Sequence, residues 1–355
     1  MHEAQTKRTV QRFAAFVLAA VLSLFSCCQW AWATPGERCL IPLGKAVGIK
    51  LFADGVLIVA TSEVEVQGKT VSPARDCGLK EGDLLLRMNE QKIESTEHLQ
   101  SLLQESGADA VTLSVKRGSK TMDVSAKPVV CGDGVCRLGA WIRDSMAGIG
   151  TLTYYDPTSG EYGALGHGIT DVDTHQLMPL SSGSIMETTV KAVKKGTRGD
   201  PGELKGDFSV QRDVGTVSAN TEGGIFGTVD DQNFLSKAKA IPVASVQEVT
   251  IGKATILATI SGSETQEYAV EIVKLYDGSQ PTRNLLLRVT DQQLLNTTGG
   301  IVQGMSGSPI LQDGKLVGAV THVVLSDATQ GYGMYIEWML EQSDRISAGD
   351  TAQAA

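Results

Sequence analysis

The sequence predicts a mainly β protein with an N-terminal membrane anchor, a small β-rich domain and a larger all-β domain. Short stretches rich in Val, Ile and Thr recur through the second half, glycine is frequent at 39 of 355 residues, and long amphipathic helices are rare. Many short strands joined by glycine turns are typical of β-barrels. With 42% hydrophobic and 20% charged residues, the chain can bury a core and is not an intrinsically disordered one.

We expect residues 1–35 to form a cytoplasmic tip and a membrane anchor or signal segment. Three basic residues precede the apolar stretch 13–28, so the basic end is expected to stay in the cytoplasm while the rest crosses the membrane. The Ala-x-Ala pattern at 31–33 alternatively marks a cleaved signal peptide. Both interpretations place the remainder outside the cytoplasm.

The charge pattern argues against a nucleic-acid partner. The formal net charge is −9, and no long basic block occurs beyond the N-terminus. Binding to phosphates needs clustered Lys and Arg, which this chain lacks.

Two cysteines, Cys131 and Cys136, enclose the short stretch "CGDGVC". In an exported protein they could close a small disulfide loop, or they could remain reduced as small buried side chains. No second pair of Cys or His has the matching spacing of a zinc site.

Residues 40–130 read as the small domain. A strand pair is expected around Asp54-Gly55, a helix from the N-cap Ser95, and a final hairpin up to residue 130. This order resembles a PDZ domain, most specifically in the stretch from Ala74 to Ser95. The resemblance implies that "LGKAVGIKL" is the loop that receives a peptide carboxylate, with the peptide added as a strand. That loop contains Gly44, Val47, Gly48 and Ile49. The alternative is a structural or docking module with an empty groove.

Residues 131–349 read as the larger domain, a single or double β-barrel that ends in one helix, "EWMLEQSDRI". It contains three histidines, His167, His175 and His322. A serine nucleophile needs a base that titrates near neutral pH, and histidine is the usual one. His167 in "GALGHGITD" lies between glycines, where a strand end can present an imidazole.

The neighbouring "HGITDVDTH" raises the alternative of a metal site. Asp171 and Asp173 lie between His167 and His175, and mixed ligands are conceivable, but the spacing fits no compact zinc or calcium pattern. We therefore expect neither a metal nor another cofactor.

The most informative motif is "GMSGSP", residues 304–309, which resembles the G-x-S-G-x-P loop of chymotrypsin-like serine peptidases. Gly304 allows a backbone conformation in which its N–H and that of Ser306 point to one place and form an oxyanion hole. Ser306 is the expected nucleophile, and Ser308 is the weaker candidate.

The carboxylate that orients the base is less defined. Asp291 keeps the chain order His, Asp, Ser, but it could equally be the N-cap of a short helix. Asp171 and Asp173 compete because they are close to His167 in sequence.

Together, "GALGHGITD", "KKGTRGDPGELKG", "TDQQLLNTTGGIVQGMSGSPI" and "THVVLSDATQGYGMYIEWML" resemble the stage IV sporulation protein B family of serine peptidases. The resemblance implies a chymotrypsin-like double β-barrel and the triad His167, Asp291 and Ser306. It also implies an exported, membrane-tethered endopeptidase that acts between the forespore membranes of endospore-forming bacteria.

The family resemblance further implies two protein substrates. One is the chain itself, cleaved in trans near its N-terminus. The other is a membrane-bound regulator, whose cleavage releases an intramembrane metalloprotease that activates a late sigma factor. A non-catalytic exported PDZ scaffold is the alternative from another functional class.

Overall fold

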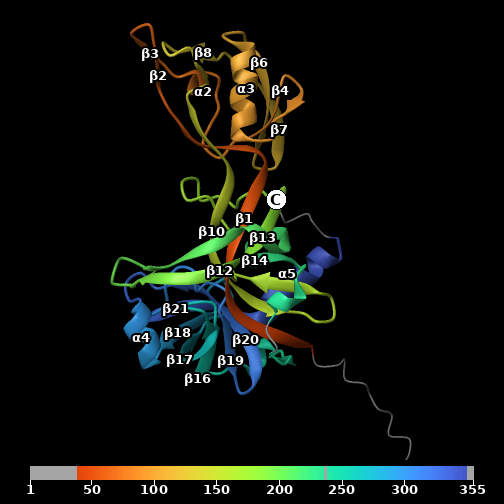
Figure 1. Ribbon diagram of the computed structural model, residues 1–355, viewed down its shortest axis with the longest axis vertical. Coiled ribbons are helices and arrows are strands. Elements are labelled where there is room, and N and C mark those ends of the chain that lie inside the picture. The colour runs from red at the N-terminus through yellow and green to blue at the C-terminus, as the bar shows by residue number, and fades with distance from the viewer. Residues whose placement is uncertain (1–37, 236–237, 350–355) are drawn as a thin grey trace, which may run out of the picture. The chain divides into compact units, whose positions relative to one another are not determined.

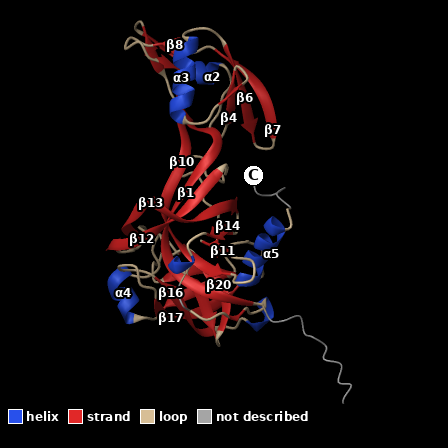
Figure 2. Ribbon diagram, turned by 45° about the vertical axis from the view of Figure 1, so that its right-hand side comes forward, coloured by secondary structure: helices blue, strands red, loops and turns tan. Residues whose placement is uncertain are grey.

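The computed structural model describes residues 38–235 and 238–349. They form a mainly β structure in which the helices are short and few (Figures 1 and 2). The prediction of a mainly β chain is confirmed. The predicted anchor at 1–35 lies outside the described residues, and within the described ranges no helix has the length and apolar character needed to span a membrane.

A small module carries most of the first third of the described chain. Its helix α3 begins at the predicted N-cap, Ser95, whose hydroxyl accepts the His98 N–H, and its leucines Leu99, Leu102 and Leu103 enter the module's core. Its elements are β2 (Val64–Val66), β3 (Lys69–Val71), α2 (Pro73–Asp76), β4 (Leu84–Met88), β5 (Gln91–Lys92), α3 (Thr96–Ser106), β6 (Val111–Arg117), β7 (Lys120–Ala126), β8 (Val129–Val130) and β9 (Cys136–Arg137).

The strand pair expected around Asp54-Gly55 is instead one strand, β1 (Cys39–Thr61). The register against β10 shifts between Phe52 and Leu57, so the Asp-Gly pair forms an irregularity and not a hairpin turn. A Cβ at Gly55 would lie 2.4 Å from the Leu85 carbonyl oxygen, and φ is +128°. The glycine is therefore required by close backbone approach and not by chain reversal.

A first barrel closes through β1 itself. Strands β10, β11, β14, β13 and β12 follow one another in the sheet, β12 pairs with β1, and β1 pairs back with β10. Every pair of neighbouring strands in this barrel is antiparallel. The strands are β10 (Ala140–Tyr155), β11 (Glu161–Ala164), β12 (Ser182–Lys194), β13 (Glu203–Thr221) and β14 (Gly224–Val229).

A second barrel is closed by six strands in the order β16-β17-β18-β21-β20-β19. It is reached through η1 (Gln232–Phe234), β15 (Ile241–Pro242) and η2 (Val246–Glu248). It consists of β16 (Gly252–Ala258), β17 (Gln266–Leu275), β18 (Leu285–Val289), β19 (Pro309–Gln312), β20 (Lys315–Val323) and β21 (Gln330–Tyr335), with α4 (Gln292–Thr298) after β18.

The C-terminal helix α5 (Ile336–Ser347) joins the two barrels by packing, and it agrees with the helix expected from the sequence. Its buried Met339 contributes to a cluster with Tyr154 and Phe226 of the first barrel and Leu316 of the second. The loops after β11 and before β19, which carry the sequence motifs, therefore belong to barrels held against each other by a common core.

Candidate active site

A cavity of about 840 Å³ is lined by loops and strands of both barrels. His167 enters it from the loop after β11, and Ser306 and Gly304 enter from the loop before β19. Ile49 of β1 and His322 of β20 also line it. Two residues that the sequence singled out as base and nucleophile thus share one cavity.

The backbone of the serine loop is left-handed on both sides of Ser306. Gly304 has φ +95° and Gly307 has φ +98°. A Cβ at Gly307 would lie 2.0 Å from the Thr151 carbonyl oxygen, so only glycine fits there. The loop is fixed to β10 because Thr151 Oγ1 donates to the Gly304 carbonyl at 2.7 Å and Thr151 N–H donates to the Ser306 carbonyl at 3.0 Å.

Two backbone donors of this loop are free. Neither the Gly304 N–H nor the Ser306 N–H has a hydrogen-bond partner in the part of the chain that the structure describes. Most backbone N–H groups in folded proteins are paired, so two free donors flanking Met305 are a site for an incoming oxygen. Unpaired donors at these two positions are what the predicted oxyanion hole requires.

The two serines of the loop differ in access. Ser306 is partly exposed, and its hydroxyl donates to the Thr321 carbonyl at 2.7 Å. Ser308 is fully buried, and its hydroxyl finds no partner among the described residues. A nucleophile must reach substrate, so Ser306 is the better candidate.

The conformation of the chain before His167 presents its ring to the cavity. Leu165 and Gly166 are both left-handed, with φ +70° and +66°. His167 Nδ1 lies 2.8 Å from the Gly168 carbonyl oxygen, which can only accept a hydrogen bond. The neutral ring therefore carries its proton on Nδ1 and keeps a lone pair on Nε2, the form that a general base needs. Burial lowers the pKa of His167, so the ring is neutral at pH 7.

A second imidazole lies beside the first. The ring centroids of His167 and His322 are 4.9 Å apart, tilted by 36°. Burial, with the like charges of His167 and Arg283, lowers the pKa of His322 to about 4. Its Nδ1 is buried and has no hydrogen-bond partner among the described residues.

The structure does not bring Asp291 to this cavity. Asp291 is the N-cap of α4, where its carboxylate accepts the Leu294 N–H at 3.0 Å, and its other oxygen faces the Ala269 N–H at 3.4 Å. It is not among the residues that line the cavity. In this structure, local helix capping uses the Asp291 carboxylate, and its role in orienting His167 stays a prediction.

The competing aspartates are also engaged elsewhere. Asp171 is fully buried and is bound by the Arg143 guanidinium and by the N–H groups of Asp173 and Thr174. Burial would raise the pKa of Asp171, but the N–H groups and the guanidinium outweigh it and lower the pKa. Asp173 pairs with the same Arg143 at 3.0 Å.

His175 lines the cavity, yet its loop does not form a metal site. Across residues 38–235 and 238–349, no three side chains of His, Cys, Asp or Glu lie together in a way that could hold a metal ion.

The loop predicted to receive a peptide carboxylate is part of the first barrel. Val47 pairs with Gly150 of β10 on one side and with Glu187 of β12 on the other, and Gly48 and Ile49 continue both ladders. Gly44 contacts the second barrel through the hydroxyl of Thr259, which donates to its carbonyl. Strand pairing uses the backbone groups of Val47, Gly48 and Ile49, and Gly44 lies in the register shift of β1 between Pro42 and Lys45, so the structure places these four residues in the first barrel and not in a PDZ loop.

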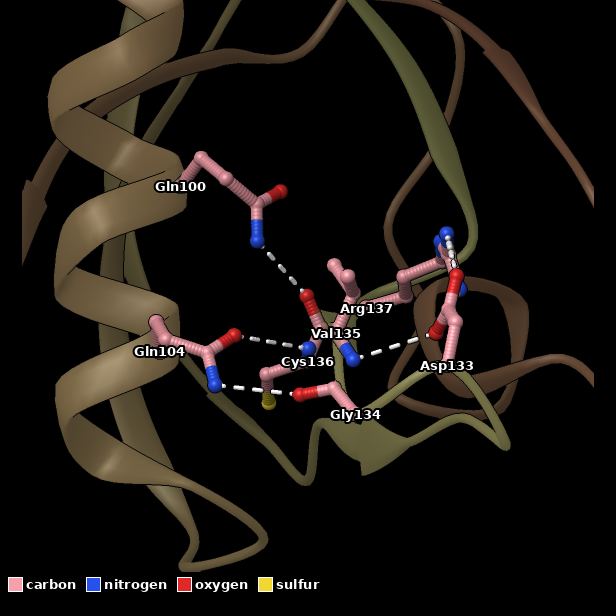
Figure 3. Close-up of polar contacts among 7 residues, drawn as sticks. All are labelled: Gln100, Gln104, Asp133, Gly134, Val135, Cys136 and Arg137. Atoms are coloured by element: carbon pink, nitrogen blue, oxygen red, sulfur yellow. Dashed lines mark hydrogen bonds and ion pairs between the residues drawn. The ribbon is translucent and has the colours of Figure 1, made fainter.

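In the small module, the chain's own residues 134–143 lie along two neighbouring elements, the edge of strand β1 and helix α3. Residues 140–143 of β10 pair with Leu57–Thr61 of β1, whose other edge holds β4. Figure 3 shows Gln100 and Gln104 of α3 binding the Gly134 and Cys136 backbone, at 2.9–3.1 Å. The edge that a peptide would extend is thus filled in this structure. The thiols of Cys131 and Cys136 are not joined.

Several cavity residues escaped the sequence reasoning. Arg283 follows a turn, Thr321 is on a buried strand, and Glu222 is in the turn between β13 and β14. None has a motif of its own. Only His322 was visible in advance, as one of three histidines in the larger domain.

Two family models match the chain. The family model described as SpoIVB peptidase S55 matches residues 134–340, and that of the PDZ domain matches residues 66–117. No curated protein matches the chain.

Two solved structures show a distant likeness. The PDZ domain of the SdrC-like protein Lmo2051 from Listeria monocytogenes is 22% identical, over 25% of this chain and 87% of that chain, with a TM-score of 0.21. The Rv3671c protease from M. tuberculosis in its active form is 15% identical, over 60% of this chain and 75% of that chain, with a TM-score of 0.30.

Proposed function

The chain belongs to the SpoIVB peptidase S55 family and is a serine endopeptidase, and from this premise we propose that Ser306 is its nucleophile and His167 its general base. Ser306 Oγ attacks the scissile carbonyl carbon while its proton moves to His167 Nε2. The imidazolium then gives that proton to the leaving amine, and a water repeats the sequence to release the acyl group. No cofactor takes part.

The observation that carries this assignment is the pair of free N–H groups at Gly304 and Ser306, beside a serine that shares a cavity with His167. In the tetrahedral intermediate both groups donate to the oxyanion. One such donor contributes about 10²–10³-fold to the rate in serine peptidases. In the ground state Ser306 donates to the Thr321 carbonyl, so its hydroxyl turns toward Nε2 when substrate binds.

Labelling by a serine-reactive fluorophosphonate tests the nucleophile. The purified wild-type chain should be labelled at Ser306, as read by peptide mass spectrometry, and Ser306→Ala should not be labelled. Ser308→Ala is the matched control and should keep the label. Labelling of Ser306→Ala at the wild-type level would contradict the assignment. Suppression of wild-type labelling by a chelator would also contradict it.

At the cellular level, the proposed substrates are the chain itself and a membrane-bound regulator, cleaved outside the cytoplasm during endospore formation. The family match, the PDZ match and the apolar stretch 13–28 support this role. Cleavage of the regulator would release an intramembrane metalloprotease and so activate a late sigma factor. The apolar stretch would tether the enzyme to the membrane that its substrate occupies.

Two readouts test this role. Purified wild-type chain should shorten near its N-terminus with time, faster at higher protein concentration if cleavage is in trans, while Ser306→Ala stays intact. In an endospore-forming bacterium lacking its own family member, the wild-type gene should restore late sigma-factor activity and Ser306→Ala should not. Restoration by Ser306→Ala would favour the alternative of a non-catalytic scaffold.

A further inference from the structure

One cation in the active-site cavity has no part in the proposed mechanism. Arg283 lines the cavity together with Ser306, and its side chain is exposed to solvent. Within residues 38–235 and 238–349, no carboxylate or other group forms an ion pair or hydrogen bond with its guanidinium. By contrast, Arg288 of the adjoining strand β18 pairs with Glu271 at 3.5 Å. A guanidinium is always charged and carries five N–H donors, so Arg283 has unused capacity to bind an anion.

Hydrogen bonds hold the loop of Arg283 against the nucleophile. The Ser306 hydroxyl donates to the Thr321 carbonyl at 2.7 Å, and the Thr321 hydroxyl donates to the Thr282 carbonyl at 2.6 Å. The Asn284 N–H donates to a carbonyl of strand β21 at 2.8 Å. Both chain neighbours of Arg283 are therefore fixed, one of them to the residue that binds the nucleophile. A backbone held in this way keeps a binding side chain in a defined part of the cavity wall.

The guanidinium of Arg283 lies over an aromatic ring. Its Cζ atom is 5.3 Å from the ring centroid of Tyr332, and that ring lies 6.4 Å from the ring of Tyr276. Stacking restrains the long side chain and leaves the N–H donors at the edge of the guanidinium free. These donors match the two oxygens of a carboxylate, with which arginine forms paired hydrogen bonds. The cation is therefore preorganised for an acidic side chain.

The surroundings of Arg283 leave its charge uncompensated. Its positive charge contributes to the lowered pKa of His322, which shows that the two side chains are close. Glu222 is the one carboxylate among the described residues that line the cavity, and it forms no ion pair with Arg283. Much of the remaining wall is apolar, as at Met146 and Leu325. A bound substrate excludes water from such a wall, and this strengthens the attraction between the cation and a carboxylate.

We propose that Arg283 is a specificity-determining residue, which selects protein substrates that carry Asp or Glu close to the scissile bond. Its guanidinium donates two hydrogen bonds to the substrate carboxylate and holds that segment in the cavity. The scissile carbonyl is thereby guided to Ser306 and to the free N–H groups of the serine loop. The inference rests on the proposed function, because it takes Ser306 as the reacting group.

Matched peptides test this preference. The full-length wild-type chain is first incubated with a proteome-derived peptide library, and mass spectrometry of the new ends gives the cleaved sequences. The best-cleaved sequence is then made as a quenched fluorescent peptide, with its acidic residue kept or replaced by the corresponding amide. The ratio of kcat/KM on the two peptides is compared for wild type, Arg283→Gln, Arg283→Lys, Arg283→Glu and Arg288→Gln. Fluorophosphonate labelling of Ser306 counts the active enzyme, and thermal unfolding shows that each variant is folded.

The wild type should cleave the acidic peptide at least about 10-fold faster than the amide, because hydrogen bonds to charged groups contribute this much. Arg283→Gln should cleave the two at about equal rates. Arg283→Lys should keep part of the preference, since an ammonium lacks the paired donors. Arg283→Glu should prefer a peptide with Lys at that place. Arg288→Gln is the matched control and should keep the wild-type ratio, because Arg288 pairs with Glu271 and does not line the cavity.

Two results would overturn the inference while leaving the proposed function intact. One is a wild type that is labelled at Ser306 and cleaves the library without a preference for Asp or Glu near the bond. The other is an Arg283→Gln variant that keeps the wild-type ratio. A merely structural role would lower both rates together and leave this ratio unchanged. A wild type that is neither labelled nor active would refute the proposed function, and the inference would fall with it.

Discussion

The sequence predicted free backbone N–H donors in two stretches, "GKAVGI" and "GMSGSP", and the structure provides them in the second. In β1, Val47 and Gly48 have strands on both sides, so their peptide groups are paired. In the serine loop, Gly304 and Gly307 are left-handed, and the N–H groups of Gly304 and Ser306 find no partner in the described chain. Gly44 of the first stretch is also left-handed, at φ +63°, so a left-handed glycine marks a binding loop only where neighbouring N–H groups are left without partners.

The largest effect that tests this contrast is expected from Gly307→Ala. The new Cβ would lie 2.0 Å from the Thr151 carbonyl oxygen and 2.6 Å from the Leu165 nitrogen, at φ +98°. Relief of both clashes requires the loop to move, so we expect a loss of about 3 kcal/mol or more in the free energy of unfolding. Fluorophosphonate labelling should fall more than about 100-fold. Urea unfolding and labelling rates check the two effects, and a folded variant with normal labelling would show that the loop tolerates other conformations.

The second-largest effect concerns the cavity, where acidification should lower the stability of the fold through His322. The pKa of His322 is about 4 in the folded protein and near 6.5 when unfolded, so the unfolded chain binds the extra proton between these values. Stability attributable to His322 is therefore complete above pH 6.5 and is lost as the pH falls toward 4, by about 3 kcal/mol. The groups that face the ring are His167 and Arg283.

The measurement is urea unfolding of wild type and His322→Gln at pH 7 and pH 4.5. The carboxylates titrate in both proteins, so the difference between them isolates the histidine. The variant should lose less stability on acidification than the wild type. Equal losses would mean that the buried ring is hydrated or paired in solution.

The two stretches also show what the sequence could and could not predict. The roles of "GMSGSP" and "GHGI" could be predicted because each stretch combines a chemically reactive residue with glycines that its turn requires. The reactive residue is a serine in the first stretch and one of few histidines in the second. The pairing of β1 with β10 and β12 was not readable, because a strand with glycines has the same local pattern as a glycine loop. Helix α3 was predictable from its cap and its leucine spacing, which are local properties.

The carboxylates illustrate the same limit. Asp291 has a local signal for helix capping and a matching position in a family motif, and the structure uses the local one. Glu222 has no signal, because its place in the cavity depends on β14 pairing with β11 and on α5 reaching the turn. Non-local pairing of this kind cannot be obtained from one sequence.

Gly48→Ala is the matched counterpart of Gly307→Ala in the paired strand and should have a smaller effect. Its Cβ would lie 2.6 Å from Phe208 Cβ, and that side chain must shift. We expect about 1–3 kcal/mol of destabilisation, typical of overpacking, with the labelling rate of Ser306 unchanged. Binding of a free peptide carboxylate should not change either. A selective loss of peptide binding would revive the PDZ-loop assignment.

Asp291→Ala should have the smallest effect, and it asks whether this aspartate acts on the helix or on the histidine. Alanine removes the acceptor for the Leu294 N–H, and loss of an N-cap costs about 1 kcal/mol. If capping is its whole role, urea unfolding shows this loss while Ser306 is labelled at the wild-type rate and with the wild-type acid limb. Asp291→Asn restores the cap and should restore the stability. A variant that is destabilised by no more than this and yet labels 100-fold more slowly would show that α4 moves toward the cavity during catalysis.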